Sequence, residues 1–148
     1  MNILNKKNYH LIYEPIDINK YYNLTLDPNC GAITMFSGTT RDYFIDNGIK
    51  KIVTKLSYES YNAMVFKELE KIENDIRKQW DIKHFVFVHR LGEVPITESS
   101  ILLVISSSHR EDSLKAIDYA INTIKKTLPI FKKEHYFDNT SIWKEQSN

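Results

Sequence analysis

The stretch FVFVHRLGEVPITESSILLVIS, residues 85–106, decides the fold of this chain. Its two ends, Phe85–His89 and Ile101–Ser106, are short runs dominated by Val, Ile, Leu and Phe, a composition that favours strands. Gly92 and Pro95 interrupt the segment between them and predict a turn or loop there. We expect the two runs to pair as antiparallel neighbours in one sheet.

Amphipathic helices are predicted before and after this pair of strands. Tyr61–Trp80 carries apolar residues at spacings of mostly three and four with charges between them, which is typical of a helix packed on a core. A second helix follows the strands and presents one apolar face, made by Leu114, Ile117, Ile121 and Ile124. Pro129 should end or kink this helix, because proline lacks the amide hydrogen and disfavours helix in the residue before it.

The remaining elements complete an α+β pattern. We expect strands at Tyr9–Tyr13, Ala32–Ser37 and Ile52–Tyr58, a short helix at Ile16–Leu24, and an edge strand or ordered tail at His135–Tyr136 and Ser141–Trp143. The order of elements predicts a mostly antiparallel sheet with helices packed on it, in a single domain over residues 1–148. Residues 1–7 and 145–148 are expected to be loose termini.

Composition limits the classes of function. Apolar residues make up 42% of the 148 residues, enough for one core, and the formal net charge is only +1. Such a balance argues against a nucleic-acid or membrane-surface protein, so any anion site must be local. The N-terminus has no apolar signal region, and we expect a cytoplasmic protein. Cys30 is the only cysteine, which excludes an internal disulfide and a cysteine-built metal site.

A candidate anion site lies in Ser106-Ser107-Ser108-His109-Arg110-Glu111. Ser108 and Glu111 are three residues apart and fit a capping box, which would place His109 and Arg110 in the first turn of the second helix. The unpaired amides and the positive dipole end of a helix N-terminus favour a phosphate or carboxylate, and both side chains would add donors. The alternative is a capped helix whose first-turn His and Arg are simply solvated.

Lysines flank the predicted helix end in the segment Lys125–Glu134. In a straight helix, Lys125 and Lys132 would lie two turns, roughly 10 Å, apart on one face, and a turn at Pro129 could make them converge. A lysine held among apolar residues and other cations loses proton affinity and becomes usable as a general acid or base. The alternative is a solvated cluster of lysines that complements the helix dipole.

Two weaker signals stand at strand ends. Gly38-Thr39-Thr40-Arg41 could expose backbone amides, two hydroxyls and an arginine that binds an oxyanion, or it could be a structural corner. His89-Arg90 sits before Gly92, and we interpret it as structural.

The order of these motifs resembles the large subunit of molybdopterin synthase, the MoaE family. The resemblance covers about residues 8 to 145. The blocks that carry it are Gly31-Ala32 with Phe36-Ser37-Gly38-Thr39 and Arg41, Tyr58-Glu59-Ser60-Tyr61, His89-Arg90-Leu91-Gly92-Glu93-Val94-Pro95, Ser106-Ser107-Ser108-His109-Arg110, and Lys125 through Glu134 with Trp143-Lys144. Taken singly the blocks are not specific, but their shared order and spacing make coincidence improbable.

The resemblance implies an α/β hammerhead fold and a sulfurtransferase of molybdenum cofactor biosynthesis. In this family a small ubiquitin-like sulfur-carrier subunit, MoaD-like, inserts its C-terminal glycine-glycine thiocarboxylate into a pocket of the large subunit. Two sulfur transfers convert cyclic pyranopterin monophosphate into molybdopterin. Because the sulfur arrives on the partner, the large subunit is expected to need no metal or other cofactor. A homodimer within a heterotetramer is the implied assembly.

The same resemblance implies the site residues. Lys125 and Lys132 match the active-site lysines, with Lys132 assigned to the carbonyl end of the tail and Lys125 to proton transfer or intermediate stabilisation. The implied substrate-binding residues are Thr39, Thr40, Arg41, His109, Arg110, Lys133 and Glu134. The family dimer lends basic groups across its interface, yet the last fifteen residues of this chain contain Lys144 and no arginine.

Other classes of function remain as alternatives. A non-catalytic α+β module that binds a phosphorylated ligand or an acidic protein tail would use the same basic groups without turnover. A phosphoryl-transfer enzyme using His109 is a weaker hypothesis, because the sequence has no carboxylate cluster for a metal and no Walker-type loop.

Overall fold

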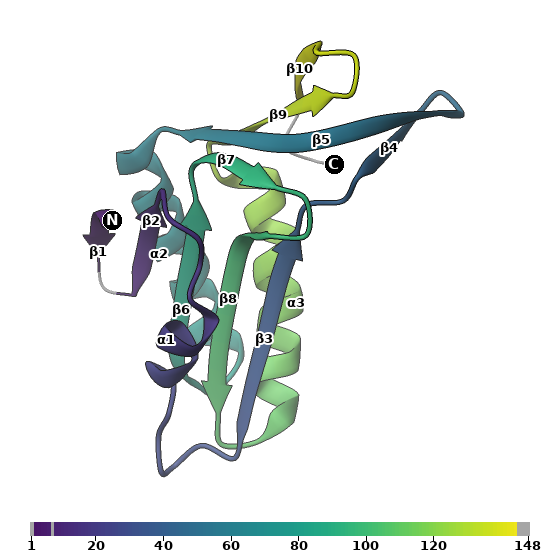
Figure 1. Ribbon diagram of the computed structural model, residues 1–148. Helices are drawn as coiled ribbons and strands as arrows, with labels where there is room; N and C mark the ends of the chain where they lie inside the picture. Colours follow the sequence, from purple (N-terminus) through teal and green to yellow (C-terminus); the bar gives the residue numbers. More distant parts are fainter. Residues whose placement is uncertain (1, 7, 145–148) are drawn as a thin grey trace.

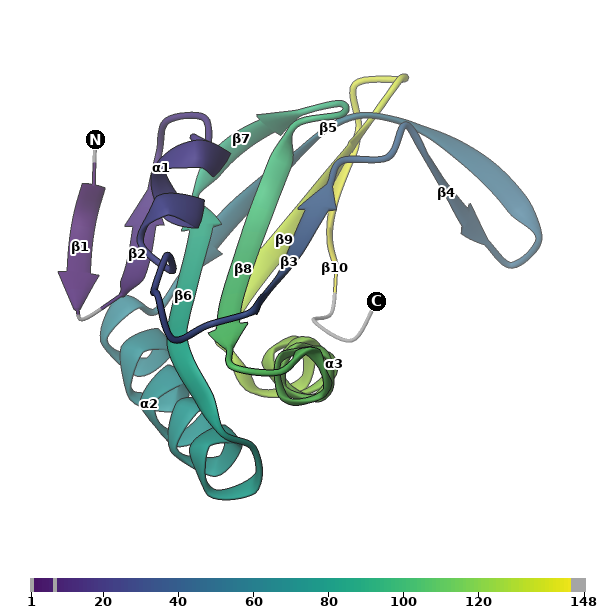
Figure 2. The same cartoon turned by 90° about the horizontal axis from the view of Figure 1, so that it is seen from below.

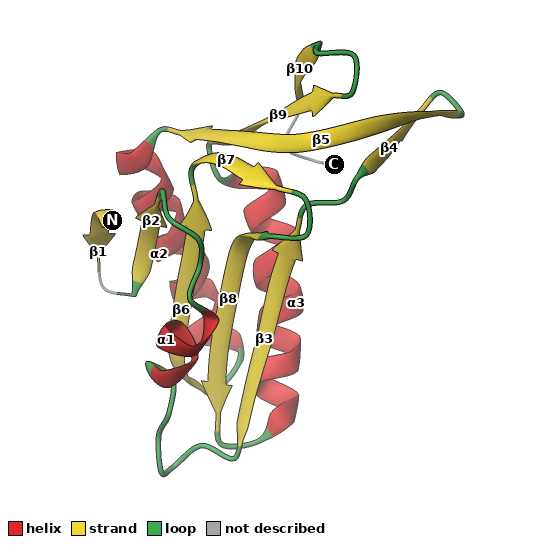
Figure 3. Cartoon of the chain, in the orientation of Figure 1, coloured by secondary structure: helices red, strands yellow, loops and turns green. Residues whose placement is uncertain are grey.

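The computed structural model describes residues 2–6 and 8–144, and for residues 2–6 the backbone only. Figure 1 shows the path of the chain and Figure 3 the distribution of helices and strands. The elements are β1 (Asn2–Lys6), β2 (Tyr9–Ile12), α1 (Ile18–Asn23), β3 (Ala32–Thr39), β4 (Tyr43–Asp46), β5 (Ile49–Ser60), α2 (Asn62–Gln79), β6 (Ile82–Arg90), β7 (Gly92–Pro95), β8 (Ser99–Ser107), α3 (Arg110–Thr127), β9 (Ile130–Tyr136) and β10 (Ser141–Lys144).

The main sheet has the strand order β1-β2-β6-β8-β3. The predicted antiparallel pairing of residues 85–89 with 101–106 is confirmed, since Val86 faces Val104 across β6 and β8. Only β2 and β6 pair in parallel within this sheet. Alternate residues of β6 point to opposite faces, so Phe85 and Phe87 join one hydrophobic cluster while Val86 joins another. Both faces of the sheet are therefore buried.

Helices cover the two faces unequally. The larger cluster lies between the sheet and the long helices α2 and α3, and the smaller one lies under α1, which contributes Tyr21. Figure 2 shows α2 and α3 on one side of the sheet and α1 on the other. Within the described residues, no helix is both long and apolar enough to cross a lipid bilayer.

A second sheet, with the order β10-β9-β5-β4, crosses one end of the first. Its longest strand, β5, also pairs with β7 through Lys55–Pro95 to Tyr58–Gly92. Gly92, the first residue of β7, adopts φ +77°, a left-handed conformation that glycine accepts without strain. The chain thus turns from the main sheet into the second sheet at this residue.

The α+β class with helices on a mostly antiparallel sheet is confirmed, with two sheets instead of one. The sequence patterns missed three short strands, β1, β4 and β7. Residues 2–6, within the N-terminal segment expected to be loose, form strand β1 and pair with β2. The expected loose residues 145–148 lie outside the described residues.

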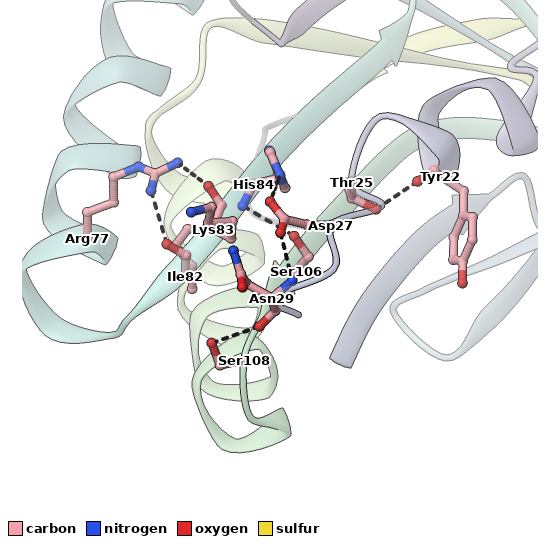
Figure 4. Close-up of polar contacts among 10 residues, drawn as sticks. All are labelled: Tyr22, Thr25, Asp27, Asn29, Arg77, Ile82, Lys83, His84, Ser106 and Ser108. Carbon is pink, nitrogen blue, oxygen red and sulfur yellow. Dashed lines mark hydrogen bonds and ion pairs between the residues drawn. The ribbon is translucent and has the colours of Figure 1, made fainter. Parts of the chain in front are cut away.

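The predicted capping box at the start of α3 is wrong. His109 is the N-cap and makes no side-chain cap hydrogen bond, while the Ser108 hydroxyl donates to the Asn29 carbonyl at 3.1 Å. The Ser107 hydroxyl instead accepts the Ser113 amide at 3.2 Å. Nearby, the His84 Nε2 lies 3.0 Å from an Asp27 carboxylate oxygen, as Figure 4 shows. Ser108 therefore ties α3 to the loop before β3 and does not cap the helix.

Gly31 provides a test of this packing. A Cβ at Gly31 would lie 2.8 Å from the backbone oxygen of Ser108, which accepts the Gly31 amide at 3.2 Å. We expect Gly31→Ala to lower the free energy of unfolding by about 1–3 kcal/mol, because neither backbone can move without disturbing the other. Urea unfolding checks this, with Cys30→Ala as the neighbouring control. Equal midpoints for the two variants would contradict the close approach.

Candidate active site

A cavity of about 590 Å³ lies where the two sheets meet the C-terminal end of α3. Such a volume lies within the range of small-molecule sites. Four parts of the chain build its wall: the ends of the main-sheet strands, the β4-β5 ribbon, the last turn of α3 and strand β9. The lining residues are Phe36, Gly38, Thr39, Arg41, Tyr43, Phe44, Val53, Leu56, Tyr58, His89, Ser100, Ile101, Ile124, Lys125, Leu128, Ile130, Lys132 and Glu134.

The two predicted active-site lysines line this one cavity. Helix α3 ends at Thr127, and the chain then continues as β9, so Lys125 lies on a helix and Lys132 on a strand. The Pro129 carbonyl accepts the Tyr61 amide at 3.1 Å and thereby fixes the turn between them. The hypothesis that a turn at Pro129 makes the lysines converge therefore agrees with the structure.

Lys132 has the electrostatic surroundings of a proton-transfer group. Burial lowers the pKa of its ammonium group, the negative charge of Glu134 raises it, and the positive charges of Lys125, Arg41 and Lys144 lower it further. The net effect lowers the pKa, so that a larger fraction of Lys132 is the neutral amine at physiological pH. A cavity that holds such a lysine can both bind an anion and exchange a proton with it.

Glu134 is the negative charge of the cavity wall. Its side chain is buried and accepts a hydrogen bond from the Tyr136 hydroxyl at 2.8 Å. The Lys144 ammonium group lies 3.8 Å from the same carboxylate and 4.3 Å from the centre of the Phe44 ring. Strand β10 therefore contributes a cation, Lys144, to the surroundings of the cavity.

Arg41 and Thr39 also lie at the cavity, whereas Thr40 does not. The Arg41 guanidinium packs 5.0 Å from the centre of the Tyr43 ring, and its Nε donates to the Tyr43 carbonyl at 3.2 Å. The Thr40 amide donates to the Glu98 carbonyl at 3.1 Å, and the Thr40 side chain is buried. At Thr40 these contacts agree with the alternative of a structural corner.

Three further predicted residues lie away from this cavity. Lys133 alternates with its neighbours on β9, and its ammonium group lies over the Trp143 ring at 5.4 Å. His109 and Arg110 stand exposed at the opposite end of α3 from Lys125. A helix of 18 residues is about 27 Å long, so these two side chains cannot reach the cavity of their own chain.

Several lining residues had been assigned no role from the sequence. Tyr58, His89 and Ser100 are polar groups on three different strands that meet at the cavity. The Tyr58 hydroxyl donates to the Ser100 hydroxyl at 3.3 Å, and the His89 ring stands edge-on to the Tyr58 ring with centroids 4.8 Å apart. Tyr58 and His89 stand in motifs that resemble the MoaE family, whereas Ser100 stands in none of them.

The interpretation of His89-Arg90 as structural holds for Arg90. The buried Arg90 guanidinium donates to a Glu98 carboxylate oxygen at 2.7 Å and so holds the turn that contacts Thr40. Across residues 8–144, no group of three or more His, Cys, Asp or Glu side chains is arranged to hold a metal ion. The cavity therefore offers cations, hydroxyls, one carboxylate and one imidazole as its chemical groups.

Comparison with known proteins identifies relatives over most of the chain. The family model described as MoaE protein matches residues 11–127. The molybdopterin synthase catalytic subunit of Homo sapiens is 45% identical over 131 residues, which cover 88% of this chain and 67% of the human protein. The Bos taurus subunit is 41% identical over 147 residues, 97% of this chain and 76% of the bovine protein. The Drosophila melanogaster subunit is 46% identical, and the chain spans only 36% of its length.

Solved structures show the same fold. Molybdopterin synthase from Staphylococcus aureus superimposes with a TM-score of 0.84 and 33% identity, over 95% of this chain and 98% of the other. A complex of subunits 1 and 2 of the molybdopterin-converting factor from Helicobacter pylori 26695 contains a chain with a TM-score of 0.74 and 25% identity, over 91% of this chain and 88% of the other.

The charges around Lys132 predict opposite effects for two substitutions. Lys125→Gln removes a positive neighbour and should raise the pKa of Lys132, whereas Glu134→Gln removes a negative neighbour and should lower it. Titration of selectively labelled lysine by NMR measures both changes. Lys126→Gln, an exposed substitution outside the cavity lining, is the control and should change nothing. Identical Lys132 titrations in all variants would show that burial alone sets the pKa.

Proposed function

Because this chain belongs to the MoaE family, we propose that it acts as the catalytic subunit of molybdopterin synthase. The proposed reaction converts cyclic pyranopterin monophosphate into molybdopterin by two sulfur transfers from the thiocarboxylated C-terminus of a small sulfur-carrier subunit. The observation that carries this proposal is the convergence of Lys125, Lys132 and Arg41 on one cavity. A concentration of cations of this kind suits an anionic substrate and an anionic tail.

The chemistry assigns different tasks to the two lysines. The thiocarboxylate sulfur bonds to the pterin and leaves the tail attached as a thioester. Water then adds to the thioester carbonyl, whose oxygen carries negative charge until the C–S bond breaks and the tail leaves as a carboxylate. A cation fixed beside this carbonyl stabilises that charge. Lys132, which is partly buried, is proposed to bind this carbonyl end. Lys125 is exposed in the last turn of α3 and lines the cavity. We propose that it transfers protons or stabilises the intermediate. Arg41 and Thr39 are proposed to bind the phosphate or the pterin.

His109 and Arg110 fit this proposal only in an assembly. Both are exposed and too far along α3 to serve their own cavity. We propose that they contribute to the cavity of a second copy, in a homodimer that binds two small subunits as a heterotetramer. The Helicobacter pylori complex of two subunits supports the small partner. Lys133, outside the cavity lining, is proposed to contact the partner or the substrate only from the rim.

Lys132→Ala tests the catalytic role. The chain, a thiocarboxylated small subunit and cyclic pyranopterin monophosphate are mixed, and the product is measured through its oxidised fluorescent derivative. We expect the variant to lose at least about 100-fold in rate, the typical loss when a preorganised charge-stabilising group is removed. Lys126→Ala, an exposed change on the adjacent helix face, should keep the wild-type rate.

Two results would decide against the catalytic assignment. If Lys132→Ala keeps the wild-type rate, Lys132 has no catalytic role. Tight binding of the small subunit and the pterin by wild-type protein without product would instead favour the non-catalytic binding module.

Mixing two inactive variants tests the shared site. Arg110→Ala and Lys132→Ala homodimers should each be nearly inactive, but after subunit exchange about a quarter of the sites would hold an intact Lys132 and an intact Arg110 if exchange is random and cavities are composite. Recovered activity in the mixture, measured by the same assay, is the expected result. No recovery after exchange has been verified by mass spectrometry would place Arg110 outside the partner's cavity.

A further inference from the structure

His89 is a buried histidine at the wall of the cavity that the proposed mechanism leaves unused. Its side chain is 6% exposed, yet it belongs to the cavity lining. It lies on β6 next to Ile101 of β8, in the row that begins with Phe85 and Phe87 on the core side of the sheet. A polar ring at the end of an apolar row requires a hydrogen-bond partner for each of its nitrogens.

Only one of the two ring nitrogens has such a partner. The Nδ1 atom lies 2.9 Å from the Arg90 carbonyl oxygen, and because a carbonyl can only accept, Nδ1 carries the proton. Burial lowers the pKa of the ring to about 4, so the ring is neutral at physiological pH. Nε2 is then an acceptor at the outer edge of the ring, and within residues 8–144 no group donates to it.

The other groups of the cavity do not duplicate this acceptor. Arg41, Lys125 and Lys132 can only donate while charged. Glu134 is charged and already accepts from the Tyr136 hydroxyl, with Lys144 3.8 Å away, and the Ser100 hydroxyl accepts from Tyr58 and donates to the Gly38 carbonyl. A ligand that carries N–H groups as well as an anionic group therefore finds, in the Nε2 atom of His89, a neutral nitrogen acceptor to which no group within residues 8–144 donates.

The position of His89 relative to the cations indicates which part of the ligand it meets. Its ring contacts Tyr58, and Tyr58 lies directly opposite Lys132 across the β5-β9 ladder. On the other side, His89 faces Ile101 across the β6-β8 ladder, and Phe36 also lines the cavity. The surroundings of His89 are thus flat, apolar and aromatic, whereas the anion-binding groups begin at Lys132. This end of the cavity suits a flat heteroaromatic ring.

We propose that His89 determines specificity by accepting, through Nε2, a hydrogen bond from a ring N–H of the pterin. This inference rests on the proposed function and deepens it. The cations select an anion, and His89 selects a donor-bearing ring, so that a simple phosphate compound without such a donor binds less well. A site built to pair with a substrate N–H rejects analogues that lack it, because the buried acceptor is then left unpaired.

The experiment compares two ligands and three variants by isothermal titration calorimetry at pH 7.5. The ligands are cyclic pyranopterin monophosphate and inorganic phosphate. His89→Phe keeps a planar ring among apolar neighbours but has no acceptor, and His89→Gln supplies an amide oxygen in its place. His10→Phe is the matched control, because His10 is also a buried histidine of the main sheet, packs against Tyr21 and is absent from the cavity lining. Thermal unfolding verifies that each variant is folded.

We expect His89→Phe to weaken the binding of the pterin about tenfold, the effect of one lost hydrogen bond, and to leave the binding of phosphate within about twofold. His89→Gln should recover most of the pterin affinity, and His10→Phe should match the wild type. Equal pterin affinity in wild type and His89→Phe would overturn the inference, and so would an equal loss for both ligands.

Two further outcomes separate the sources of failure. If the wild-type protein does not bind the pterin, the proposed function fails, and the inference fails with it. If His89→Phe instead weakens binding of the small subunit, measured in the absence of pterin, then Nε2 accepts an amide of the partner's tail and the proposal for the pterin is wrong.

Discussion

The ladder between β5 and β9 is the constraint on which the cavity depends. It runs from Val53–Tyr136 to Ser60–Ile130 and carries the chain back across the end of the main sheet immediately after α3 stops. Because the ladder fixes which residues of β9 alternate toward the core, it places Lys132 and Glu134 on the cavity side together. A shift of one residue would exchange them for Lys133 and remove both the amine and its carboxylate partner.

Charge balance around this ladder explains how several cations tolerate one another. Arg41, Lys125 and Lys144 all lower the pKa of Lys132, and Glu134 opposes them from within the same wall. An isolated buried carboxylate would be costly, but here it is hydrogen-bonded and paired. Glu134 therefore offsets part of the positive charge around Lys132, whereas Arg41 and Lys125 are exposed. The net positive charge of the lining suits an anionic ligand.

Periodicity in the sequence predicted the long elements well and the short ones poorly. Strands β6 and β8 and helices α2 and α3 each carry enough apolar residues to reveal their period. The β7 strand was predicted as a turn because Gly92 and Pro95 stand at its ends, and only tertiary pairing with β5 makes it a strand. The residues after Pro129 were considered as a helix end, since lysine spacing alone does not distinguish a helix face from a strand.

The site was predictable as far as a residue's chemistry is visible in a motif. Lys125 and Lys132 were assigned through the resemblance to the MoaE family, because the local pattern also fits a solvated lysine cluster. The separation of Arg110 from them follows from the length of α3, which the sequence already predicted as one helix ending near Pro129. The role proposed for His89 needed the orientation of its ring.

The pairing of β5 limits how the sulfur carrier is recognised. Over Lys55–Tyr58, both edges of β5 are already paired, one with β7 and the other with β9. An incoming peptide tail therefore cannot be added as an extra strand at this stretch of β5.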